Sequence, residues 1–231
     1  MQNTNAKRFI FSAYANTVSA VLQEPAKAFL SDAPSAAIPT TGGLSSHSKE
    51  TISLMIESHE VLRAGRVSAT VLAEKRGNNY VTLATSTVEN LNILDVITAD
   101  AIVSRIISVF PADGSRLERC SADDHKALFH LARSRFENLK IDGKLRECEL
   151  GSKFGKEAGF FVKQCEEQPV HGSLFAEGCT EFQIPHFGAI RVGQVDAYSG
   201  KVVLTMLRVE LGCPIVGTVS VCDASTNGVD G

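Results

Sequence analysis

The stretch Tyr80–Val109, YVTLATSTVENLNILDVITADAIVSRIISV, is the longest β-favouring part of the chain and decides its fold class. It is rich in Val, Ile, Leu and Thr, which favour strands, and it contains neither Gly nor Pro. Apolar residues occupy odd and even positions alike, whereas a strand with one wet face would alternate apolar and polar residues. We therefore expect part of the stretch to be buried on both faces, as in the middle of a sandwich or solenoid.

A helix is the competing interpretation of residues 98–109. The apolar residues with helical spacing there are Ala99, Ile102, Val103 and Ile106. Strand remains favoured, because β-branched side chains lose rotamer freedom in a helix. The polar residues of the stretch are Asn90, Asn92, Asp95, Thr98 and Asp100. We expect bends there, since Asx side chains hydrogen-bond their own backbone at corners.

Turn signals on both sides of this stretch predict hairpins. Gly77-Asn78-Asn79 predicts pairing of residues 66–76 with 80–88, and Asp142-Gly143 predicts another tight turn. Residues 187–198 and 201–211 flank Ser199-Gly200 and should pair, followed by a last strand at 215–222. Residues 51–75 contain one or two strands, and residues 8–22 favour a strand over an amphipathic helix.

Three further segments depart from the strand pattern. Residues 121–133 predict a helix, with Ser121 as N-cap and acidic residues in the first turn. Residues 24–50, rich in Pro, Ala and Ser, predict a covering loop or linker. Residues 223–231 predict a frayed tail.

A short internal repeat links the central stretch to a later segment. Ser86-x-x-Glu89-Asn90-Leu91-x-Ile93 recurs as Ser134-x-x-Glu137-Asn138-Leu139-x-Ile141, at an offset of 48 residues. The repeat is either coincidence or the mark of a repeated strand-and-corner unit, in which each copy needs a neighbour to bury its face.

Length and composition place the chain among globular β proteins. Its 231 residues predict a single β-rich domain over residues 1–231, an antiparallel sandwich or short β-solenoid with one helix near 121–133. A net charge of −3 gives no basic surface for nucleic acid. No run approaches the roughly 18 apolar residues of a membrane span.

The cysteines predict buried free thiols rather than a metal site or a disulfide framework. The six are Cys120, Cys148, Cys165, Cys179, Cys213 and Cys222, and no pair has CxxC spacing. The apolar run near the N-terminus is too short for a signal peptide, so we expect a cytoplasmic protein, with export the alternative. In that compartment thiols stay reduced.

The run Val88–Ile107 resembles a segment of bacterial choice-of-anchor surface proteins. The resemblance is carried by Asn90-Leu91-Asn92-Ile93-Leu94 leading into Ile97-Thr98-Ala99-Asp100-Ala101. It implies a β-rich fold and brings no catalytic residues with it.

Candidate site residues are few. Asp124, His125 and His130 form the densest polar cluster and are weak candidates for metal ligands, since the two histidines are five residues apart rather than four. His59 lies between carboxylates that could tune its pKa, and His186 precedes a strand, so these two are weak catalytic candidates. In each case a solvated polar segment is the simpler interpretation. No cofactor motif is present.

The absence of a dense catalytic cluster favours a non-enzymatic structural or protein-interaction protein. We expect it to form a homo-oligomer or bind a protein partner, by self-association through sheet edges. The alternative is a small-ligand binder or enzyme with a polar site in a β-cavity.

Overall fold

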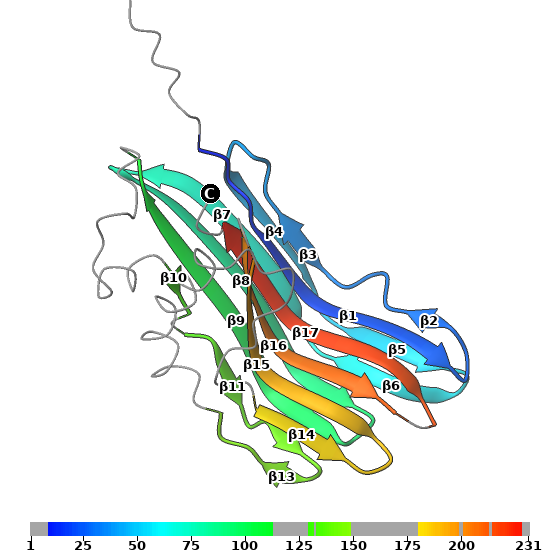
Figure 1. The fold of residues 1–231 in the computed structure, drawn as a ribbon. Coiled ribbons are helices and arrows are strands. Elements are labelled where there is room, and N and C mark those ends of the chain that lie inside the picture. Colours follow the sequence, from blue (N-terminus) through cyan, green and yellow to red (C-terminus); the bar gives the residue numbers. More distant parts are fainter. Residues whose placement is uncertain are drawn as a thin grey trace, which may run out of the picture.

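The computed structural model describes residues 9–112, 129–131, 133–148, 180–198, 201–212 and 214–227. These residues form a sandwich of two antiparallel sheets (Figure 1). Sheet A contains β1 (Tyr14–Glu24), β2 (Ala28–Phe29), β3 (Ser35–Ala37), β14 (Thr180–Ile184), β15 (Gly188–Tyr198), β16 (Lys201–Leu211) and β17 (Val216–Asn227). The prediction of a mainly β, sandwich-type fold is confirmed.

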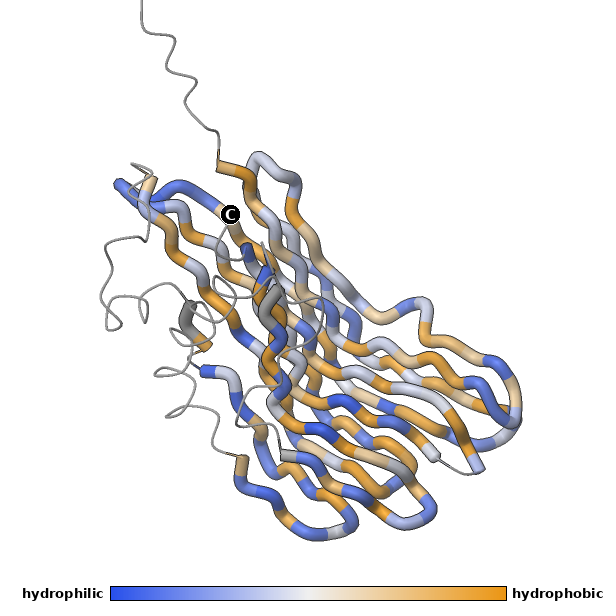
Figure 2. Tube along the Cα trace, in the orientation of Figure 1, coloured by the Kyte–Doolittle hydropathy of each residue, from blue (hydrophilic) through white to orange (hydrophobic). Residues whose placement is uncertain are grey.

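Sheet B carries the central stretch. Its strands are β4 (Gly43–Lys49), β5 (Ile52–Ile56), β6 (His59–Ala64), β7 (Val67–Arg76), β8 (Asn79–Ile93), β9 (Ile97–Pro111), β10 (Phe129–His130), β11 (Arg135–Glu137), β12 (Lys140–Ile141) and β13 (Lys144–Leu145). The predicted hairpins are confirmed as β7–β8, β12–β13 and β15–β16. Hydrophobic and polar segments alternate along the strands (Figure 2).

The predicted helix at 121–133 is wrong where the structure describes it. Phe129 and His130 form β10, which pairs with Ser108 and Ile107 of β9. Pairing with the edge of a long strand overrides a local helical pattern. Residues 121–128 and 132 lie outside the described residues, and no helix occurs among those that are described.

The central stretch is one long hairpin, which confirms strand over helix for residues 98–109. Strand β8 pairs with β9 from Asn79 opposite Pro111 to Ile93 opposite Ile97. The tight turn places Leu94 and Asp95 at positive φ, 51° and 57°. Asn92 Oδ1 accepts a hydrogen bond from the Asp95 backbone N–H at 2.8 Å, so this corner falls where the polar residues predict one.

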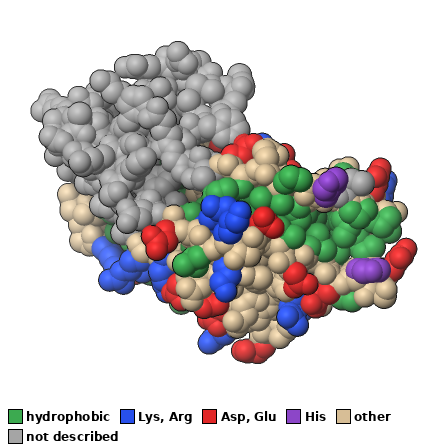
Figure 3. All heavy atoms as spheres, turned by 90° about the horizontal axis from the view of Figure 1, so that it is seen from below, with side chains coloured by type: hydrophobic (Ala, Val, Ile, Leu, Met, Phe, Trp, Pro, Cys, Tyr) green, Lys and Arg blue, Asp and Glu red, His purple; other side chains and the backbone are tan. Residues whose placement is uncertain are grey.

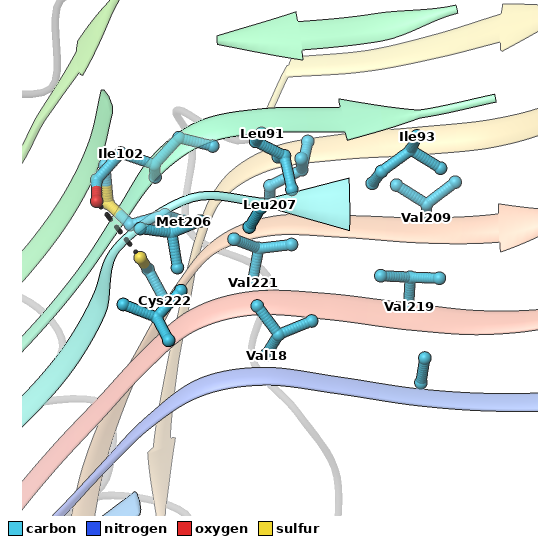
Figure 4. Close-up of a cluster of buried hydrophobic side chains, with 14 of the residues drawn as sticks. Val18, Leu91, Ile93, Ile102, Met206, Leu207, Val209, Val219, Val221 and Cys222 are labelled. Atoms are coloured by element: carbon cyan, nitrogen blue, oxygen red, sulfur yellow. Dashed lines mark hydrogen bonds between the residues drawn. The ribbon is translucent and has the colours of Figure 1, made fainter. Parts of the chain in front are cut away.

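A line of irregular pairing positions, the seam, crosses both sheets. In sheet A the pairing register passes over one residue in each of four strands, namely Thr17, Cys222, Met206 and Gly193. Cys222 and Gly193 have positive φ, 56° and 72°. In sheet B the register passes over Asn90, at φ 51°. At the seam both strands of each pair leave one residue unpaired while the register is kept, so the set of alternate residues that faces inward changes in all of them together. Cys222 Sγ donates a hydrogen bond to the Ile102 carbonyl at 3.2 Å, so the part of the seam in sheet A lies close to the part in sheet B (Figure 4).

The seam largely explains why apolar residues occupy both odd and even positions in Tyr80–Val109. In β8 the even residues Ala84 and Val88 face the core before Asn90, and the odd residues Leu91 and Ile93 face it afterwards. Burial on both faces is nevertheless confirmed over residues 101–104, all of which are buried. A parity change and local two-sided burial therefore combine in one sequence pattern.

The internal repeat is a repeated structural unit. Glu89 of β8 and Glu137 of β11 both pair with Ala101 of β9, one on each side. Asn138, like Asn90, has a φ of 51°. Leu139 and Ile141 are buried like their counterparts Leu91 and Ile93. The two copies thus flank β9 in the same register, with the same corner.

The seam divides the core into two halves of different composition. The aliphatic half is lined by large side chains such as Val18, Leu91, Ile93, Leu207, Val209, Val219 and Val221 (Figure 4). The small-residue half also contains large side chains such as Val88, Ile102 and Ile106, but it differs in holding many small ones, namely Ala15, Thr82, Ala84, Ser86, Ser104, Ser108, Ala224 and Thr226, all buried.

Two segments expected to be irregular carry strands. Residues 24–50 contain β2, β3 and β4, because β1 and β7 offer backbone partners on both sides of this segment. Of the predicted tail, residues 223–227 belong to β17, and residues 228–231 lie outside the described residues. Asn227 fixes this end: its Oδ1 accepts from the Ser12 backbone N–H at 2.8 Å and its Nδ2 donates to the Ile10 carbonyl at 2.6 Å.

Candidate functional sites

Strand β4, sequence GLSSHSK, is an open edge of sheet B. It pairs with β7 from Gly43 opposite Ala73 to Lys49 opposite Val67, without a register shift. In the described part of the chain, no other backbone hydrogen bond involves residues 43–49. Its second side therefore presents unpaired N–H and C=O groups. Leu44 is 69% exposed, and Ser46 bonds Thr70 across the β4–β7 pair at 2.8 Å.

Three other edge strands, β2, β3 and β5, are better protected. The edge strands β2 and β3 have two and three residues. Strand β5 has a register shift between Leu54 and Met55. Such short or bulged edges resist pairing with another chain. Strand β4 has seven residues, and its only charge is Lys49 at its end, paired with Asp32.

A polar surface, the carboxylate face, lies on sheet A beside the small-residue half. Asn16, Asp223, Thr205 and Gln194 are consecutive cross-strand neighbours on β1, β17, β16 and β15. The residues that alternate with them, Ala15, Ala224, Leu204 and Val195, belong to the core. The polar row therefore lies on the outer side of the sheet. The next row contains Tyr14, Ser225, Val203 and Asp196.

The two carboxylates on this face are satisfied to different degrees. Asp223 accepts a hydrogen bond from Ser220 Oγ at 2.8 Å, and the side chains of Thr205 and Asn16 also bond it. Asp196 Oδ2 accepts from Gln194 Nε2 at 2.8 Å. Asp196 Oδ1 and Gln194 Oε1 have no hydrogen-bond partner among the described residues.

Burial governs the protonation of this face. It raises the pKa of Asp196 and of Asp223 above the usual aspartate range, although their hydrogen bonds and the charge of Arg208 act in the opposite direction. Burial also lowers the pKa of Lys201, whose Nζ lies 4.2 Å from the centre of the Tyr14 ring. The face thus holds charged groups at a cost to the folded state.

The histidine and aspartate candidates do not form a site among the described residues. His59 starts β6 beside a turn, and His186 lies in the β14–β15 turn with a φ of 61°; both are exposed. Figure 3 views the molecule from the end that these turns occupy, and hydrophobic side chains gather there. His130 is in β10, while Asp124 and His125 lie outside the described residues.

Sequence reasoning missed the carboxylate face entirely. Asp196, Thr205 and Asp223 are isolated polar residues within strands, and only the register of four strands brings them into adjacent rows. The polar position Gln194-x-Asp196 in an apolar strand is the one local signal that could have pointed to it.

Two other classes of site find no support in the described ranges. No group of three or more His, Cys, Asp or Glu side chains there could hold a metal ion. No helix there is long and apolar enough to cross a membrane. Cys222 is a buried free thiol, as expected, whereas Cys148 is free but only half-buried, and the other four cysteines lie outside the described part of the chain.

The chain matches the model of a family described as Domain of unknown function (DUF8256) over residues 9–171. This is more than half of the chain, so the protein belongs to that family. No curated protein and no solved structure matches it. The resemblance to choice-of-anchor proteins and the expected cytoplasmic location stay predictions.

Proposed function

We propose that this member of the DUF8256 family is a non-enzymatic protein-interaction protein that self-associates by pairing β4 strands edge to edge. The observation that carries the proposal is the seven-residue edge strand β4, which has no bulge and no proline and leaves one side of its backbone unpaired. An exposed edge of this kind is a template for a further strand.

The sequence of β4 suits antiparallel pairing with a second copy of itself. A twofold axis at Ser46 sets Leu44 opposite Ser48 and Lys49 opposite Gly43 of the partner. No like charges then face one another, which would destabilise a cross-strand pair. The same patch serves both copies, so the contact closes as a dimer rather than growing into a fibre.

Backbone pairing alone predicts a weak dimer. Each added hydrogen bond contributes about 0.5–1.5 kcal/mol net, and a seven-residue overlap offers roughly one bond per residue. Association costs at least about 4 kcal/mol in lost freedom. The balance is about 6.5 kcal/mol at most and about 3 kcal/mol for average bonds, which corresponds to dissociation constants from tens of micromolar to several millimolar.

Sedimentation velocity over a wide concentration series tests the proposal. We expect the mean mass to rise from that of the monomer toward that of the dimer between about 10 μM and about 1 mM, the range set by the weak pairing energy. A monomer at every concentration overturns the proposal.

Two neighbouring proline variants supply a matched control. Alternate residues of an edge strand direct their N–H groups toward β7 and toward solvent, so Ser46→Pro and His47→Pro differ in which group they remove. We expect one variant to fold normally and stay monomeric, because it loses only an outward donor. The other should lose a bond to β7 and melt at a lower temperature. Unchanged dimerisation in the stable variant contradicts edge pairing.

A further inference from the structure

Two oxygen atoms on the carboxylate face lack a hydrogen-bond donor although their side chains are buried. Gln194 is 4% exposed and Asp196 is 7% exposed, yet Gln194 Oε1 and Asp196 Oδ1 have no partner. A buried polar atom without a partner is costly, and native proteins leave few of them. These atoms therefore point to a missing donor.

The two acceptors form one unit. They lie two residues apart on the same side of β15, and Gln194 Nε2 bonds Asp196 Oδ2 at 2.8 Å. That bond uses the amide nitrogen of Gln194 and one carboxylate oxygen of Asp196, and it leaves one acceptor oxygen on each of the two linked side chains. Ser225, 1% exposed, also has an unpartnered hydroxyl, but Val203 separates it from Asp196 across the sheet.

The charge at this position is uncompensated. No ion pair among the described residues involves Asp196, and Lys201, on the next row, lies over the Tyr14 ring. Arg208 acts on Asp196 only through its longer-range charge. A group that supplied both a positive charge and N–H donors would satisfy the two oxygens together.

We propose that Gln194 Oε1 and Asp196 Oδ1 form a binding site for a cationic hydrogen-bond donor, an ammonium or guanidinium group. A small amine and the side chain of a lysine or arginine in a partner both offer this chemistry. The ligand reaches the site by local opening, because both side chains are nearly buried. The proposal is independent of edge pairing by β4.

A titration of the full-length protein by carboxyl-carbon NMR tests the site. The probes are methylammonium, methylguanidinium, tetramethylammonium and Ca²⁺, with the peptides Gly-Lys-Gly and Gly-Arg-Gly to separate free amines from side chains. We expect the first two or the peptides to shift the Asp196 resonance and lower its pKa, because a bound cation favours the carboxylate. Tetramethylammonium, which has no N–H, should not bind.

Asp223, the other carboxylate on this face, provides the control. We expect Asp196→Asn and Gln194→Leu to weaken binding by about tenfold or more, equivalent to 1.4 kcal/mol. Asp223→Asn should leave affinity unchanged, since Asp223 already has its donors. Equal weakening by Asp196→Asn and Asp223→Asn, binding of tetramethylammonium, binding of Ca²⁺ alone, or no response to any probe overturns the proposal.

Discussion

The outer surfaces of the two halves of the sandwich differ in how their charged side chains are paired. Outside the aliphatic half, Arg191 bonds Glu181 at 3.0 Å and Glu210 at 2.5 Å on a partly exposed surface. Outside the small-residue half, Asp196 is buried and Asp223 half-buried, and neither forms an ion pair with another described residue. Exposed pairs contribute little to stability, whereas buried unpaired carboxylates oppose it. The comparison shows that the charges outside the aliphatic half are nearly neutral for stability, whereas those outside the small-residue half oppose it.

The largest expected effect comes from the aliphatic half. Ile93 is fully buried there, so Ile93→Ala should lower the free energy of unfolding by about 2–5 kcal/mol, through lost burial and the cavity left behind. Urea denaturation measures the change. As a control in the other half, Thr82→Ala removes a hydroxyl without a partner and should cost far less. Equal losses of unfolding free energy in the two variants would contradict the distinction between the halves.

A smaller effect of the opposite sign is expected from the carboxylate face. Asp196→Asn should raise the free energy of unfolding at neutral pH by about 1 kcal/mol, because the substitution removes a buried charge. Asp223→Asn tests the other carboxylate. It should raise the free energy of unfolding by less, because three side chains donate hydrogen bonds to the charged form of Asp223.

The pH dependence follows from the raised pKa of Asp196. In the folded state its proton is bound at a higher pH than in the unfolded state, so the stability cost is full above the folded pKa. The cost disappears as pH falls through the folded pKa toward the unfolded value. We therefore expect Asp196→Asn to gain less stability at mildly acidic pH than at neutral pH. Thermal denaturation at several pH values measures this, and a gain that grows with acidity contradicts it.

The smallest effects separate two serines that face one another across the β8–β9 pair. Ser86 Oγ donates to the Asn16 carbonyl at 2.9 Å, whereas Ser104 Oγ has no partner. Ser86→Ala should therefore cost about 1 kcal/mol, and Ser104→Ala should be close to neutral. Chemical denaturation of both variants under the same conditions tests the difference. A larger loss in Ser104→Ala would mean that its hydroxyl is bonded in solution.

Local sequence signals predicted the strands and turns well. Asp142-Gly143 and Gly77-Asn78 encode tight turns in their own backbone preferences, and the repeat around Asn90 and Asn138 reports a real corner. Strand β10 could not be predicted, because Phe129 and His130 become a strand only by pairing with β9. The carboxylate face depends on the successive pairing of β1 with β17, β17 with β16 and β16 with β15, and β1 lies far from the other three strands in the sequence.

The buried thiol at the seam gives this protein its own reporter of opening. Burial raises the pKa of Cys222 to about 12, and its Sγ atom bonds a carbonyl of the opposite sheet. Alkylating reagents attack the thiolate, so they can modify this sulfur only when the sheets separate. The rate at which the sulfur is labelled therefore measures how often the sandwich comes apart.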